Sequence, residues 1–181
     1  MTKRSQFVVM TALAAEAISM APRLVVISGC GTSGRVAFLT ARRHNALLAA
    51  KNEPPLFAYA IAGGDAALLL SDELPEDDAR AGAAALRAAA AGRRAALLIG
   101  VSCGLSAPYV AGGLDLAAAA PLAAGFSATD DGDGGGVVVG AECRYAAFAL
   151  GFNPVEHARA APLGSDGRTV KDSVRALRAA G

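Results

Sequence analysis

Apolar residues gather in four short runs, and each run closes on a segment rich in glycine or hydroxyl side chains. The runs are Leu24–Ser28, Leu56–Ile61, Ala95–Val101 and Tyr145–Leu150. Continuous apolar runs of this length are typical of parallel strands that are covered on both faces. Stretches of helical composition alternate with them, at Ser33–Lys51, Glu76–Ala91, Ala107–Ala119 and Thr169–Ala180. The alternation predicts an α/β domain built on a doubly wound parallel sheet.

Two of the expected helices have marked starts. Pro75 precedes three consecutive carboxylates, Glu76 to Asp78, which are expected in a first helical turn where the helix dipole favours negative charge. Ser106 stands two residues before Pro108, and this spacing predicts a serine N-cap with proline in the first turn.

Two segments fall outside the alternation. Phe7–Ala21 is apolar, but it is short and interrupted by Glu16, so we expect residues 1–22 to form an N-terminal helical segment and not a membrane span. Residues 23–181 then form the main domain. Within it, about 123–142 include the run Asp130–Gly136, which predicts a flexible insertion loop.

The insertion also carries part of a calcium-loop pattern. Asp131, Asp133, Gly136 and Glu142 match positions 1, 3, 6 and 12 of such a loop. However, Gly135 supplies no side-chain ligand at position 5, and no obvious helix follows. We therefore expect no metal site here.

Composition narrows the class of protein. The hydrophobic fraction is 54%, the charged fraction 18% and the net charge +1, so no strongly basic surface for nucleic acid is expected. Three cysteines without regular spacing argue against a disulfide framework and favour a reducing, cytoplasmic setting. No Cys/His cluster indicates zinc, and no membrane partner is expected.

The loop after the first apolar run is the first candidate for chemistry. It reads Ser28-Gly-Cys-Gly-Thr-Ser-Gly-Arg35, and Gly31 would let the backbone approach an anion closely. Thr32 and Ser33 add hydroxyl groups at a helix N-terminus, where unpaired N–H groups favour phosphate. A nucleotide site fits less well, since no lysine follows and no acidic residue closes the second strand. A plain turn without a ligand is the other alternative.

A second hydroxyl-rich loop follows the third apolar run. Ser102 and Ser106 flank Gly104 just before a helix. Loops at the carboxyl ends of parallel strands share one edge of the sheet, so the two loops predict one shared anion site. A serine nucleophile would need a base within reach, and His44 lies about three turns into the first helix, so no catalytic serine is expected.

The acidic cluster of Glu73, Glu76, Asp77 and Asp78 leaves two interpretations open. It is either a solvated helix start, or one of its carboxylates enters the site and accepts hydrogen bonds from sugar hydroxyls.

Taken together, five runs resemble the SIS (sugar isomerase) domain family, and more closely its glucokinase regulatory branch. They are SGCGTSGRVAFL (28–39), IAGGD (61–65), PEDD (75–78), GVSCGLSAPYVAGGLD (100–115) and GFNPVEHAR (151–159). The resemblance implies a flavodoxin-like three-layer sandwich and a site for fructose 6-phosphate or fructose 1-phosphate. It assigns the ligand to Gly31, Thr32, Ser33, Glu76, Ser102, Gly104 and Ser106, with Glu76 meeting the sugar.

The run GTSGR is shared with the related N-acetylmuramate 6-phosphate etherases. Their first helix carries an acidic residue eight positions beyond the arginine of this run, and here that position is Arg43. The resemblance therefore implies a regulatory sugar-phosphate-binding module without catalytic residues or cofactor. An etherase-like lyase or a sugar-phosphate isomerase is the alternative, since Glu76 remains.

The regulatory branch carries two SIS domains and a helical lid that gives a lysine to the ligand, and this chain shows one such domain. The resemblance implies a hexokinase or glucokinase as partner. A chain with one such domain is expected to be either a fragment that lacks the second SIS domain, an incomplete gene model, or a minimal homologue that pairs with itself. The resemblance also allows the protein to be located in the nucleus as well as in the cytoplasm.

Overall fold

The fold is built on a four-stranded parallel sheet. The structure, a computed structural model, describes residues 24–70, 74–120, 143–151 and 153–180. Its strands are β1 (Val25–Gly29), β2 (Phe57–Ile61), β3 (Ala95–Val101) and β4 (Arg144–Leu150). They lie in the order β2-β1-β3-β4, and every neighbouring pair is parallel. All four predicted strands are confirmed to within one residue at either end.

Each face of the sheet takes alternate residues of the strands, as the two-residue period of a strand requires. Val26 and Leu98 point into one core, whereas Val25, Ile27 and Leu97 point into the other. Strand β1 is buried along its whole length, and its first three residues, Val25 to Ile27, are all apolar.

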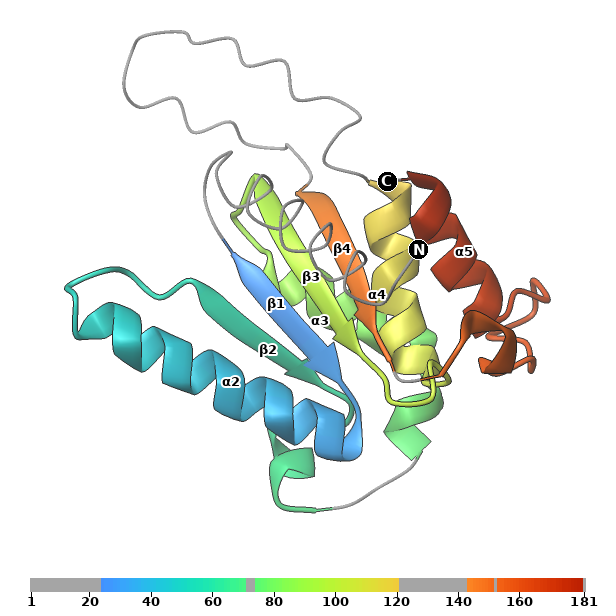
Figure 1. Cartoon of the computed structure of the whole chain (residues 1–181), viewed down its shortest axis with the longest axis horizontal. Helices are drawn as coiled ribbons and strands as arrows, with labels where there is room; N and C mark the ends of the chain where they lie inside the picture. Colours follow the sequence, from blue (N-terminus) through green and yellow to red (C-terminus); the bar gives the residue numbers. More distant parts are fainter. Residues whose placement is uncertain (1–23, 71–73, 121–142, 152, 181) are drawn as a thin grey trace, which may run out of the picture.

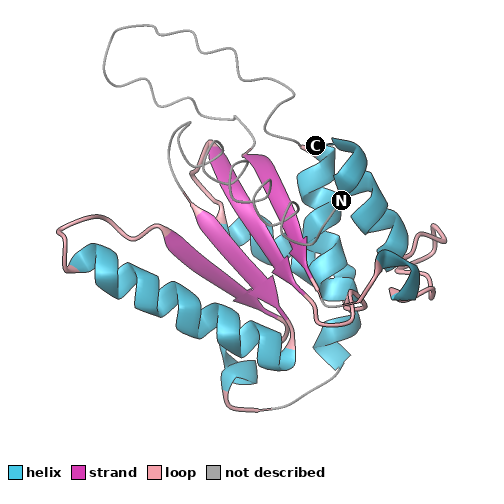
Figure 2. Ribbon diagram, in the orientation of Figure 1, coloured by secondary structure: helices cyan, strands magenta, loops and turns pink. Residues whose placement is uncertain are grey.

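Helices cover both faces, which gives the predicted three layers (Figure 1). One face carries α2 (Gly31–Ala49), which lies against β2 and β1. The other carries α3 (Ala79–Ala89), α4 (Pro108–Ala119) and α5 (Val170–Ala180), which pack side by side (Figure 2). This confirms the doubly wound α/β fold. None of the helices in the described ranges combines the length and apolar character needed to cross a bilayer.

The expected helix Glu76–Ala91 is wrong at its start. Residues Leu74–Asp77 form a 3₁₀ turn, and α3 begins only after Asp78. Asp78 is the N-cap, because its carboxylate accepts a hydrogen bond from the Ala81 N–H at 2.9 Å. The acidic cluster is therefore divided: Asp78 caps the helix, and Glu76 and Asp77 lie in the turn before it. Glu73 lies outside the described residues.

The predicted segment 1–22 and the insertion at about 123–142 lie outside the described residues, as does the calcium-loop pattern within the insertion. The boundaries of both segments stay predictions.

The two helices α3 and α4 touch through their backbones. A Cβ atom placed on Gly82 would lie 1.8 Å from the Tyr109 carbonyl oxygen, and one on Gly112 would lie 1.8 Å from that of Ala79. Only glycine permits this approach. Glycine normally weakens a helix interior, so both residues serve the contact between helices.

Gly82→Ala is expected to destabilise the protein by roughly 1–3 kcal/mol, although alanine is the better helix former, because the added methyl group forces α3 away from α4. Urea unfolding measures the change in free energy of unfolding. Gly164→Ala is the matched control, because a Cβ there meets only one atom, at 4.0 Å. Equal stability of the two variants would contradict the close contact.

Candidate functional site

The candidate site lies where the chain reverses its winding direction. Strands β1 and β3 are neighbours, yet α2 leaves β1 for one face of the sheet and α4 leaves β3 for the other. The carboxyl ends of two such strands form a crevice, and open α/β sheets bind their ligands there. The two hydroxyl-rich loops follow β1 and β3, so the fold places both at this edge (Figure 1).

The loop after β1 turns directly into α2. Cys30 is the N-cap residue in an extended conformation, and its side chain makes no capping hydrogen bond. Gly31 follows with φ +47°, in the left-handed region that favours glycine. Thr32 is exposed and Ser33 is partly exposed, both in the first helical turn, whose N–H groups have no partner within the helix. This turn offers hydroxyl and backbone donors toward the solvent.

The arginine that ends the GTSGR run has a structural role. Arg35 Nε donates a hydrogen bond to the Leu68 carbonyl at 3.2 Å, and its Nη2 donates to the Leu70 carbonyl at 3.1 Å. It therefore ties α2 to the segment that follows β2.

The loop after β3 is organised by Ser102. This serine is buried, and its hydroxyl oxygen accepts hydrogen bonds from the N–H groups of Ser106 at 3.1 Å and Ala107 at 3.4 Å. The prediction that Ser106 caps α4 is wrong, because the N-cap is Ala107. Ser106 stays exposed instead, with its Oγ 3.1 Å from the point where a Cβ on Gly104 would lie.

Leu105 holds this second loop in an uncommon conformation. Its φ is +50°, which is strained for a bulky side chain and costs about 1–3 kcal/mol. The side chain is buried in the core, and its N–H donates to the Ser102 carbonyl at 3.0 Å. The surrounding packing thus maintains a backbone shape that the residue alone would avoid.

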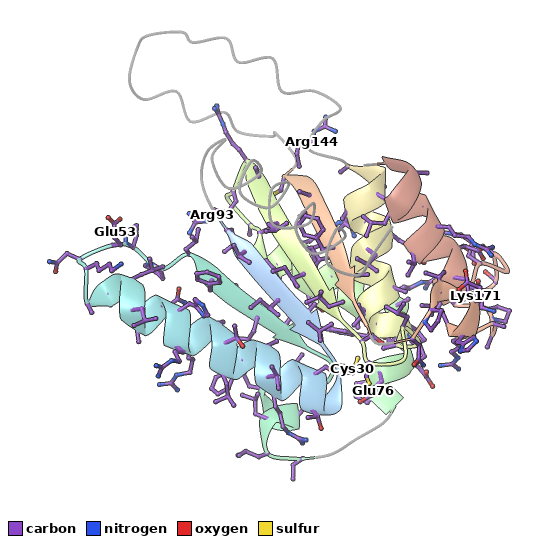
Figure 3. The ribbon with its side chains drawn as sticks, viewed as in Figure 1. Cys30, Glu53, Glu76, Arg93, Arg144 and Lys171 are labelled. Carbon is purple, nitrogen blue, oxygen red and sulfur yellow. The ribbon has the colours of Figure 1, made fainter. Side chains whose placement is uncertain are left out.

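Glu76 is brought to the first loop by the 3₁₀ turn Leu74–Asp77. A Cβ atom on Gly31 would lie 3.1 Å from Glu76 Oε1, so the carboxylate stands over that glycine. Figure 3 shows Cys30 and Glu76 together at the carboxyl end of β1. Of the two interpretations left open for the acidic cluster, this position agrees with a carboxylate at the site. Spacing along the sequence had not separated Glu76 from its neighbours.

The Cys30 thiol is buried at this edge, near the negative charges of Glu76 and Asp77. Burial raises its pKa to about 12, and the negative charges of Glu76 and Asp77 add to the effect. Cys30 is therefore a neutral packing residue near neutral pH, and not a nucleophile.

Arg43 and His44, which the sequence analysis considered for catalysis, lie on α2 away from its N-terminus. Arg43 is exposed and lies twelve residues beyond Gly31 on α2, about 18 Å along the helix axis at 1.5 Å per residue. An acid at that position would not reach Glu76 within this chain, so Arg43 carries little weight against catalysis. His44 is exposed beside it, with Nδ1 2.9 Å from the Thr40 carbonyl oxygen and its ring against Phe57.

Within the part of the chain that the structure describes, no three His, Cys, Asp or Glu residues come together as a metal site.

Comparison with known proteins identifies the domain. The family described as "Glucokinase regulatory protein N-terminal SIS domain" matches residues 8–118, well over half of the chain. The chain belongs to this family. The match takes in both loops and Glu76, and it begins inside the segment 1–22.

Full-length relatives agree with this assignment. The glucokinase regulatory protein of Xenopus laevis is 44% identical over 92 residues, and those of Mus musculus and Homo sapiens are each 45% identical over 92 residues. The matched stretch is 51% of this chain but only 15% of each relative. The chain therefore corresponds to a small part of these proteins.

The cysteines give a test of the site's geometry. Iodoacetamide at pH 8 is expected to label Cys103, which is exposed, and to spare Cys30, which is buried with a raised pKa. Peptide mass spectrometry of the native protein measures both labels, and labelling in urea shows that both peptides are detectable. Equal native rates for the two thiols would mean that the edge is more open than described.

Proposed function

We propose that this SIS domain binds a phosphorylated sugar of the fructose 6-phosphate or fructose 1-phosphate type and acts as a regulatory module. The observation that carries the proposal is the meeting of two hydroxyl-bearing loops at one topological switch point, with the Glu76 carboxylate beside the first loop. Hydroxyl groups and the N–H groups of a first helical turn suit a phosphate, and a carboxylate suits sugar hydroxyls.

Charge orients the ligand within this proposal. A phosphate dianion and the Glu76 carboxylate repel each other, so they occupy opposite ends of the site. The phosphate then lies toward Ser33, Ser102 and Ser106, and the sugar hydroxyls lie toward Glu76. Gly31 and Gly104 keep both loops free of side chains that would fill this space.

The proposal also covers the protein partner of this chain and its location in the cell. The relatives are named as regulators of glucokinase, which supports a hexokinase or glucokinase as the partner of this chain. A second SIS domain, or a second copy of this chain, is a further partner in this proposal. A cytoplasmic setting, with the nucleus as a further location, follows from the family in the same way.

Calorimetric titration with fructose 6-phosphate and fructose 1-phosphate tests the proposal. Saturable binding is expected, and Ser106→Ala is expected to weaken it about tenfold or more, because a hydrogen bond to a charged group is removed. Ser165→Ala is the matched control, since Ser165 is an exposed serine outside the two loops after β1 and β3. The proposal fails if millimolar ligand gives neither heat nor a shift in Tm.

One observation favours a second function. Glu76 stands beside the first loop, and an etherase-like lyase would use such a carboxylate as an acid or base. Incubation with N-acetylmuramate 6-phosphate separates the two functions. No lactate release is expected from the regulatory module. Turnover that Glu76→Gln reduces about 10²–10⁴-fold would establish the lyase instead.

A further inference from the structure

A third loop, which follows β4, packs directly against the loop after β3. A Cβ atom on Gly151 would lie 2.5 Å from the Leu105 Cγ and 2.7 Å from the Ser102 carbonyl oxygen. Glycine is therefore required at this position, because any side chain would displace Leu105 from its buried place. Since strand β4 pairs with β3 in parallel, this third loop leaves the sheet at the same edge as the other two.

The third loop brings a polar side chain to the second loop. Asn153 is exposed, and its Nδ2 lies 3.7 Å from the point where a Cβ on Gly104 would stand. The Ser106 Oγ lies 3.1 Å from the same point. The amide and the hydroxyl therefore both lie beside Gly104, close enough for one tetrahedral anion to reach both donors.

The same segment also reaches the acidic turn. Arg159 Nη1 pairs with the Asp77 carboxylate, which belongs to the same 3₁₀ turn as Glu76. Both side chains are substantially exposed, so the pair adds little stability. Its effect on the site is electrostatic, since it offsets one negative charge next to the edge where a phosphate would bind.

We propose that Asn153 is a further ligand-binding residue, whose amide group donates a hydrogen bond to the phosphate of the bound sugar phosphate beside Ser106. This inference rests on the proposed function and extends it, because it adds the loop after β4 as a third wall of the site.

Calorimetry on the full chain tests the role of Asn153, with fructose 6-phosphate and inorganic phosphate as the two probes. Asn153→Ala is expected to weaken both by about tenfold, since a hydrogen bond to a charged group is lost. Asn153→Asp is expected to weaken both further, because a carboxylate of nearly the same shape repels the phosphate. Glu156→Gln, an exposed change in the same segment, is the control and should bind as the unmodified chain does.

Thermal unfolding of each variant accompanies the titrations, and an unchanged Tm is expected because Asn153 is exposed. The outcomes separate the two proposals. If the unmodified chain binds neither probe, the proposed function fails and this inference fails with it. If the unmodified chain binds both probes and the Asn153 variants bind equally well, only the inference is overturned. Weaker fructose 6-phosphate binding with unchanged phosphate binding would place Asn153 at the sugar and overturn its assignment to the phosphate.

Discussion

Strand β1 is hydrogen-bonded along both edges by parallel partners, β2 on one side and β3 on the other. Helices cover both faces of such a central strand, so its side chains are buried on both sides. The chain leaves the strand at its carboxyl end. The helix after β1 crosses one face and the helix after β3 crosses the other, and this topological switch point is where open α/β sheets bind their ligands. The two hydroxyl-rich loops lie at one edge because of the pairing of β1 with β3.

The regular elements could be predicted because each has a local cause. Buried parallel strands give continuous apolar runs, and the four runs fell within a residue of the observed strands. The candidate residues on the two loops could also be selected, since an anion needs donors at strand ends. The resemblance added Glu76 to them, and the sequence pattern alone did not distinguish it from Asp77.

The remaining details depend on contacts between distant parts of the chain. Asp78 could be assigned as a cap only after the 3₁₀ turn was seen, because a capping carboxylate and a first-turn carboxylate look alike in sequence. Ser102, not Ser106, supports the start of α4, and this reversal comes from the turn that Leu105 makes. Asn153 stands in a run that carried the resemblance, but nothing marked it as a ligand residue, since its place beside Gly104 follows from the pairing of β4 with β3.

The glycine contacts between α3 and α4 have a consequence for binding. Gly82 and Gly112 lie near the starts of these helices, so the backbones of the acidic turn and of the second loop are joined through a contact that leaves no room for sliding. The contact therefore restrains the spacing between the acidic turn and the second loop. A ligand that spanned both would lose little free energy to ordering these two segments, so its affinity would depend mainly on the contacts it made.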